Sequence, residues 1–149
     1  GERAALTAEA SRPDPAVKEE VWERIHQQGY DSLQLAMAAA AGFWRRTQRE
    51  LVEPYVAPFF DGLAGLFGAW EAEAARAYYR TFFPAYRVQS STRDAVAKVL
   101  ARLDLGPMLH RLLTETDHDL ERALNARGLV AAALDIGPDA EVAGEGDPA

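Results

Sequence analysis

An arginine-rich segment is the strongest candidate for binding chemistry in this chain. Arg45 and Arg46 follow Phe43-Trp44 directly, and Arg49 comes one turn later. A guanidinium can hold a carboxylate through two parallel hydrogen bonds, so Arg45 and Arg46 could belong to an anion-binding site for a carboxylate. The simpler interpretation is a surface patch that pairs with neighbouring acids. We expect the aromatic pair to lie in the core and hold the arginine heads at the surface.

The histidines are the next candidates, as metal ligands. His110 and His118 lie eight residues apart on one predicted helix, about 12 Å along its axis. They therefore cannot share one ion at bond lengths of about 2 Å. Asp117-His118-Asp119 is a local cluster, but adjacent helical residues point in different directions. This spacing favours a solvated helix face over a metal site, and His26 is interpreted as a boundary residue of its helix.

Several motifs of known chemistry are missing from the sequence. It has no HExxH zinc motif, no glycine-rich phosphate loop, no GxSxG nucleophile turn and no cysteine. We therefore predict that this chain contains no catalytic residue, no metal ligand and no cofactor, and is not an enzyme by itself.

Charge and hydropathy restrict the partners and the location. The net charge of −7 disfavours a nucleic-acid partner, because such proteins need a basic excess. No apolar run approaches the roughly 18 residues that span a bilayer, and the first ten residues lack the pattern of a secretory signal. We expect a cytoplasmic protein without a membrane partner.

Composition predicts the fold class. The 149 residues include 29 alanines but only 17 β-branched residues. Alanine is the best helix former and β-branched residues favour strands, so the chain is predicted to be all-α. Its length suits one domain with a real core.

Capping signals and apolar spacing predict about seven helices with short connections. Asp14-Pro15 is a typical helix start, and Val17, Val21 and Ile25 line the helix that follows. The other boundaries are an end before Pro13, a cap at Asp31 or Ser32, a short helical stretch at 44–52, a stop at Pro84, a cap at Ser91 or Thr92, a new start at Gly106-Pro107 and an end near Gly128.

The most apolar helix is predicted to start at Pro54 and run to Trp70. Pro58 should bend it, because proline cannot donate to the carbonyl one turn earlier. Gly62, Gly65 and Gly68 form a glycine strip along it. Each costs about 1 kcal/mol relative to alanine, so we expect a close helix contact there as compensation.

The end of the chain differs from the rest. The last thirteen residues carry four acids and no base, with many Gly and Pro residues. Such a segment cannot bury enough apolar surface to offset the entropy of ordering it. We therefore divide the chain into a helical domain, residues 1–128, and an acidic, mobile tail, residues 129–149.

Four segments carry a resemblance to a known family. They are AEASRPDPAVKEEVW (8–22), GFWRRTQRELVEPYVAPFF (42–60), the helix stop at Phe83-Pro84 and LHRLLTETDHDLERALNAR (109–127). In this order they resemble the C-terminal helical domain of the aminopeptidase N family of zinc metallopeptidases, and actinobacterial members most closely.

This resemblance implies an α-solenoid of HEAT-like antiparallel helix pairs. It also implies that the chain is the distal, non-catalytic module of a much longer enzyme that removes N-terminal residues from peptides. In that family the module covers the catalytic domain and restricts substrate access. The zinc and its HExxH motif lie in the catalytic domain, so no catalytic residue carries over to this chain. The implied partners are that catalytic domain and its peptide substrates. Under this resemblance, Arg45 or Arg46 is expected to contact the free carboxylate of a peptide substrate.

Two alternatives stay open from the residues. A free-standing helical-repeat module would bind another protein on its concave face. A ligand-binding helical bundle of a bacterial regulator would need a basic helix-turn-helix segment, which the sequence does not show.

Overall fold

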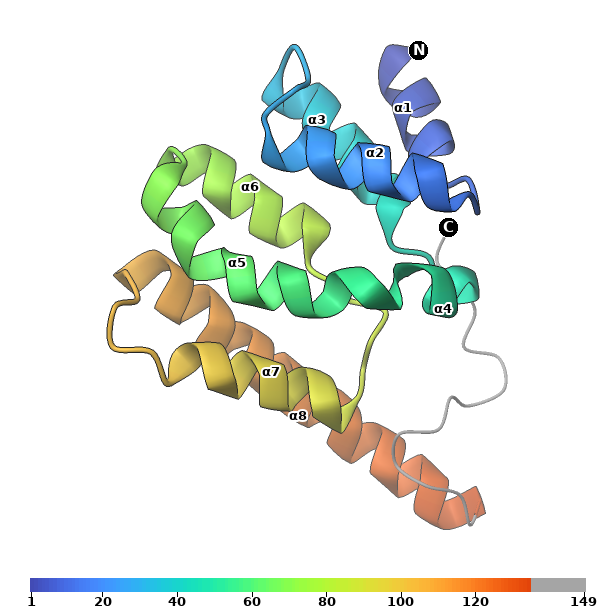
Figure 1. Ribbon diagram of the computed structural model, residues 1–149. Coiled ribbons are helices and arrows are strands. Elements are labelled where there is room, and N and C mark those ends of the chain that lie inside the picture. The colour runs from blue at the N-terminus through green and yellow to red at the C-terminus, as the bar shows by residue number, and fades with distance from the viewer. Residues whose placement is uncertain (135–149) are drawn as a thin grey trace. The chain divides into compact units, whose positions relative to one another are not determined.

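The computed structural model describes residues 1–134, and within them every regular element is a helix (Figure 1). This confirms the predicted all-α class and the estimate of about seven helices. The helices are α1 (Glu2–Ala10), α2 (Pro15–His26), α3 (Leu33–Phe43), the single turn α4 (Arg49–Val52), α5 (Val56–Ala69), α6 (Ala72–Phe82), α7 (Ser90–Leu100) and α8 (Pro107–Leu134), with 3₁₀ turns at Arg46–Gln48 and Glu53–Tyr55.

The described residues form two compact units. The first comprises residues 1–59 and 69–86, and the second comprises 60–68 and 87–134. The division therefore falls within α5.

Local capping explains where several helices begin. The Asp14 carboxylate accepts from the Ala16 amide at 2.9 Å, and Pro15 occupies the first turn of α2. The Ser32 hydroxyl accepts from the Leu35 amide at the start of α3. These side chains satisfy amides that have no partner inside the helix, so the predicted starts of α2 and α3 are confirmed.

In the first unit, α3 is the central helix. It packs against α1, α2 and α6. α1 runs parallel to α3: the Thr7 hydroxyl donates to the Ala38 carbonyl at 2.7 Å, and Ser11 lies beside Gly42. α2 runs antiparallel to α3, because Lys18 near the start of α2 reaches Phe43 at the end of α3.

Aromatic side chains fill the core of the first unit. Phe82 is fully buried and lies at its centre. Its ring is 5.6 Å from that of Trp22, 5.1 Å from Phe43 and 5.3 Å from Tyr78, all in tilted arrangements. Rings at such distances add to the stabilisation that each one gains from burying apolar area. This packing joins α2, α3 and α6.

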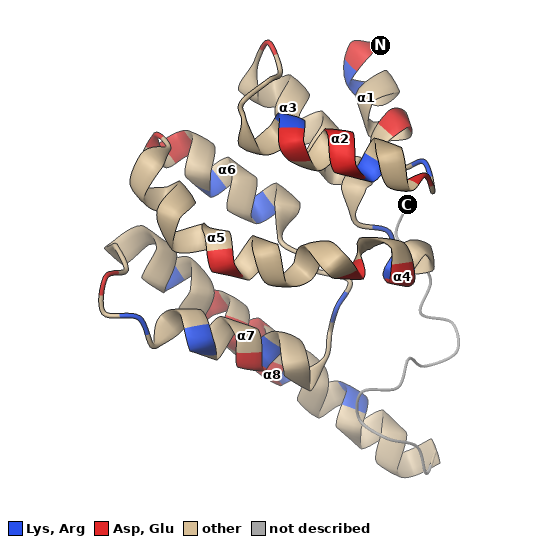
Figure 2. Ribbon diagram, in the orientation of Figure 1, with Lys and Arg blue, Asp and Glu red and all other residues tan. Residues whose placement is uncertain are grey.

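In the second unit, α7 and α8 form an antiparallel pair. Arg93 on α7 binds Asp117 and Glu121 on α8, and Arg127 further along α8 donates to the Val88 carbonyl just before α7. Figure 2 shows acidic and basic residues interspersed along this pair. Charged side chains therefore supplement the buried leucines of α8 in holding the two helices together.

Two predicted helix boundaries in the second unit are wrong. The cap of α7 is Gln89 and not Ser91 or Thr92; Thr92 is fully buried and its hydroxyl accepts from Arg87. α8 does not end near Gly128 but continues to Leu134. A single glycine costs a helix only about 1 kcal/mol, which the following alanine- and leucine-rich residues offset. The remainder of the predicted tail, 135–149, lies outside the described residues.

The apolar segment also differs from the prediction. A 3₁₀ turn precedes α5, which begins at Val56 and places Pro58 in its first turn, where an amide donor is not needed. A Cβ at Gly62, Gly65 or Gly68 would meet no atom within 4 Å, so the predicted close contact at this strip is wrong.

Candidate functional site

The arginine segment starts from a fixed point in the core. Phe43, the last residue of α3, is fully buried, and the indole of Trp44 donates to the Phe82 carbonyl at 2.7 Å. The two rings contact each other edge to face at 4.8 Å. The prediction that this aromatic pair anchors the segment is confirmed.

The segment then forms a tight turn. Trp44 and Arg45 are extended, and residues 46–48 form a 3₁₀ turn in which the Gln48 amide donates to the Arg45 carbonyl at 2.9 Å. The side-chain amide of Gln48 donates to the Ser11 carbonyl at 2.8 Å, at the end of α1. Hydrogen bonds therefore tie the turn to α1 as well as to the core.

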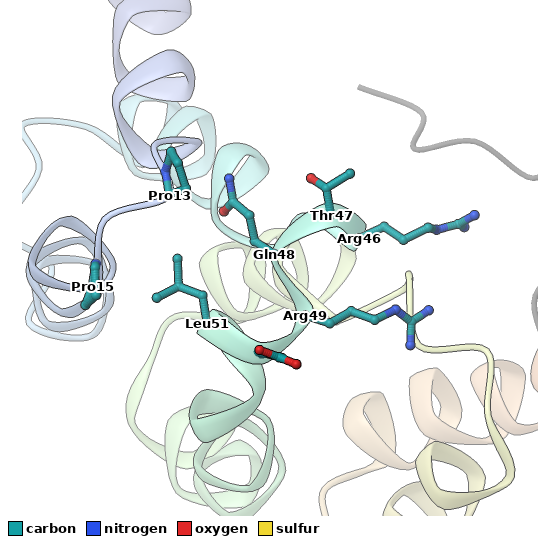
Figure 3. Close-up of a pocket in the computed structure, with 8 residues that line it drawn as sticks. Pro13, Pro15, Arg46, Thr47, Gln48, Arg49 and Leu51 are labelled. Carbon is teal, nitrogen blue, oxygen red and sulfur yellow. The ribbon is translucent and has the colours of Figure 1, made fainter.

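An open cleft of about 720 Å³ lies beside this turn. It is lined by Pro13, Pro15, Arg46, Thr47, Gln48, Arg49, Glu50 and Leu51. In Figure 3 the guanidinium groups of Arg46 and Arg49 extend toward the same side, while Pro13, Pro15 and Leu51 lie on the other. The lining thus has two guanidinium groups on one side of the turn and apolar residues on the other, with Glu50 also among its residues. A pair of guanidinium groups is suitable for binding a carboxylate.

The two predicted site residues are placed differently. Arg46 lines the cleft, whereas Arg45 is outside its lining. Arg49, three residues further on, lies beside Arg46 instead, with its guanidinium 5.4 Å from the centre of the Tyr86 ring. The role of Arg45 or Arg46 in binding a carboxylate remains a prediction.

His26 contributes to the core of the first unit. Its Nδ1 lies 2.6 Å from the Trp22 carbonyl and its Nε2 lies 2.7 Å from the Tyr78 hydroxyl. Since a carbonyl only accepts, the proton of the neutral ring is on Nδ1, and the hydroxyl donates to Nε2. Burial lowers the pKa of His26, although the bond to the Trp22 carbonyl opposes this shift.

The acidic cluster on α8 is occupied by ion pairs. Asp117 accepts from Arg93 at 2.7 Å, and this hydrogen bond holds the pKa of the carboxyl below its usual value. Asp119 pairs with Arg122 one turn away. Within residues 1–134 there is no group of three or more His, Asp or Glu side chains that could hold a metal ion. These residues therefore do not fit a zinc site.

Sequence reasoning missed Lys18. This side chain is fully buried, and its Nζ donates to the carbonyls of Ala10 and Phe43. A signal was present: Lys18 precedes Val21 by three residues and Ile25 by seven, so it shares their buried helix face. Its partners are main-chain oxygens, which any residue supplies, and so the sequence could not reveal them.

The fold and the cleft show what class of protein this is. The described part of the chain is an all-helical module whose helices include antiparallel pairs and which presents an arginine-lined cleft. None of the helices in residues 1–134 is long and apolar enough to cross a membrane.

A comparison with known proteins finds a relative of this chain. The chain is 34% identical over 135 residues to Aminopeptidase N of Streptomyces lividans, and this confirms the resemblance to the aminopeptidase N family. The match covers 91% of this chain but only 16% of the length of that relative. No family model matches the chain.

Proposed function

We propose that this chain is the C-terminal, non-catalytic module of a zinc aminopeptidase that removes N-terminal residues from peptides. The observation that carries the proposal is the extent of the match: nearly the whole chain aligns with a small fraction of an aminopeptidase N. The longer aminopeptidase to which this module would belong is called the parent enzyme.

The proposed architecture is an α-solenoid of HEAT-like helix pairs. The antiparallel pairs α2–α3 and α7–α8 support it, because each such repeat is a pair of antiparallel helices. In the parent enzyme this module would cover the catalytic domain and restrict access of long or folded peptides. The catalytic domain and the peptides are the proposed partners, and we propose that the parent enzyme is cytoplasmic.

The proposed zinc belongs to the catalytic domain of the parent enzyme. Residues 1–134 offer no suitable ligand set. When bound, zinc would polarise the scissile carbonyl and activate water. The module would contribute binding surface and not the chemical step.

The first test compares this chain with its coding context. An in-frame HExxH upstream of Gly1 is the expected result. The 149-residue chain should then hydrolyse no aminoacyl substrate, whereas the longer product should hydrolyse it. An isolated reading frame, or hydrolysis by the chain itself, would contradict the proposal, and the first outcome would favour a free-standing interaction module.

Within this function, we propose that the arginine segment captures the free carboxylate of peptide substrates. Arg45 and Arg46 were the candidates from sequence. The cleft favours Arg46, which lines it together with Arg49. Two guanidinium groups on one side of the turn can hold a carboxylate.

The second test is kinetic and uses the parent enzyme. Arg46→Ala should raise KM several-fold for peptides with a free carboxyl end and leave kcat nearly unchanged, because only uniform binding is lost. Short chromogenic substrates without that carboxylate should be unaffected. Arg45→Ala tests the alternative arginine. Arg80→Ala is the matched control, since Arg80 is exposed on α6 and outside the cleft lining. Unchanged peptide KM for both Arg45→Ala and Arg46→Ala would refute carboxylate capture.

A further inference from the structure

Lys18 is a buried cation that joins two helix ends. It has no exposed surface, and its Nζ donates to the Ala10 carbonyl at 2.6 Å and to the Phe43 carbonyl at 2.8 Å. Ala10 is the last residue of α1 and Phe43 is the last residue of α3. A side chain of α2 therefore satisfies terminal carbonyls of both its neighbours, where helices lack internal donors.

The electrostatics of this arrangement are balanced without a carboxylate. Each helix C-terminus carries about half a negative charge, so two of them together offset about one ammonium group. The Phe43 ring adds a favourable face, with its centre 5.4 Å from Nζ. Burial, and to a lesser extent the charge of Arg45, lower the pKa of Lys18 to about 8, which still leaves the amine mostly protonated at pH 7.

The same contacts lie at the start of the arginine segment. Phe43 is the residue at which α3 stops, and the chain leaves it in extended conformation through Trp44 and Arg45. The far end of the turn is tied by Gln48 to Ser11, next to Ala10. The carboxyl end of α1 is thus a shared anchor: Lys18 connects it to the beginning of the segment, and Gln48 connects it to the end.

We propose that Lys18 is the positioning residue of the cleft: by joining the ends of α1 and α3, it fixes where residues 44–49 leave the core and thereby places Arg46 and Arg49. The consequence for carboxylate capture rests on the proposed function. The structural part concerns this chain by itself and is tested separately.

The structural test is amide hydrogen exchange in the 149-residue chain. Lys18→Met keeps the length and apolar stem of the side chain but removes both hydrogen bonds. We expect exchange of the Gln48 amide, which reports the 3₁₀ turn, to become at least tenfold faster, with amides of α7 and α8 unchanged.

Thr7→Val is the matched control. It also removes a hydrogen bond between α1 and α3, the one from the Thr7 hydroxyl to the Ala38 carbonyl, but away from the segment. The Gln48 amide should change less than threefold in this variant. Equal acceleration in both variants, or none in Lys18→Met, would overturn the proposal, because Lys18 would then contribute only general stability.

The functional test is the KM of the parent enzyme. Lys18→Met should raise KM for peptides with a free carboxylate and not for chromogenic substrates without one, with kcat nearly unchanged. Faster exchange at Gln48 with an unchanged KM would uphold the positioning role and refute carboxylate capture by this cleft. If exchange of the Gln48 amide is unchanged in Lys18→Met, the positioning role of Lys18 is refuted, whatever KM is measured.

A measurement on the unmodified chain covers the case in which Lys18→Met does not fold. Native-state exchange at low denaturant should show the Lys18 ammonium protons and the Gln48 amide becoming accessible in the same opening step. Exchange of Gln48 while the ammonium protons remain protected would overturn the proposal.

Discussion

Substituting Gly42 with alanine should destabilise the first unit, although alanine is the better helix former. A Cβ at this position would overlap the Thr7 carbonyl oxygen and would lie 2.9 Å from the Ser11 hydroxyl and 3.1 Å from the Ala10 Cβ. The Thr7 oxygen cannot turn away, because it accepts from both the hydroxyl and the amide of Ser11. α1 must therefore move by about 1 Å to reach ordinary van der Waals separation.

The magnitude follows from three opposing effects. Overpacking a tight contact costs about 1–3 kcal/mol, and displacing α1 weakens the Thr7–Ala38 hydrogen bond, worth about 1 kcal/mol. The higher helix propensity of alanine stabilises the folded state by about 1 kcal/mol. We expect a net loss of about 2 kcal/mol for Gly42→Ala, or about 4–8 °C in Tm for a chain of this size.

Gly65→Ala is the matched control for this prediction. Gly65 is also inside a helix, but a Cβ there would meet no atom within 4 Å. Only helix propensity acts, so Tm should rise by about 2–3 °C. Thermal unfolding followed by far-ultraviolet circular dichroism measures both variants. If Gly42→Ala were neutral or stabilising, the close approach of α1 to α3 would be refuted.

Three further predictions concern buried polar groups. The pKa of Lys18 is about 8 in the folded chain and 10.5 in the unfolded chain, so between these pH values the unfolded state binds more protons. The free energy of unfolding should therefore rise by about 2 kcal/mol from pH 7 to 9.5. Chemical denaturation should show this rise in the unmodified chain and not in Lys18→Met. The pKa of His26 is also lower in the folded chain than in the unfolded chain, so the free energy of unfolding should fall as the pH drops below 6.5. His26→Gln should show a smaller fall over the same pH range. Tyr78→Phe leaves Nε2 of His26 without its donor and should cost about 1–2 kcal/mol in the free energy of unfolding at pH 7.

The order of the helices could be predicted because local signals determine it. Asp14 and Ser32 cap helices through amides two or three residues away, and Pro84 and Pro107 stop or start them through their own geometry. None of these effects needs a distant partner. This is why apolar spacing together with capping residues was sufficient for the all-α class.

The errors arose where contacts outside the local pattern decide the outcome. Thr92 has a suitable side chain for a cap, but it is buried and accepts from Arg87. Glycine spacing predicts a close helix contact on α5, whereas α1 closely approaches Gly42, which follows a run of alanines on α3. Whether a glycine allows a close approach depends on which helix crosses it, and no local pattern contains that information.

The sequence could predict in part which arginines lie together in the cleft. Adjacent residues on a helical turn point in different directions, as in the Asp117-His118-Asp119 cluster. The same geometry disfavours Arg45 with Arg46 and favours Arg46 with Arg49, whose spacing of three residues places them on one side of the turn. The spacing could not predict that α3 ends abruptly at Phe43. The Phe43 carbonyl at that end accepts from Lys18, 25 residues earlier in the chain, so a tertiary hydrogen bond lies where the turn begins. Under our proposal, Lys18→Met changes the position of Arg46 and Arg49 and leaves both charges in place. Comparing it with Arg46→Ala therefore distinguishes the effect of position from the effect of charge.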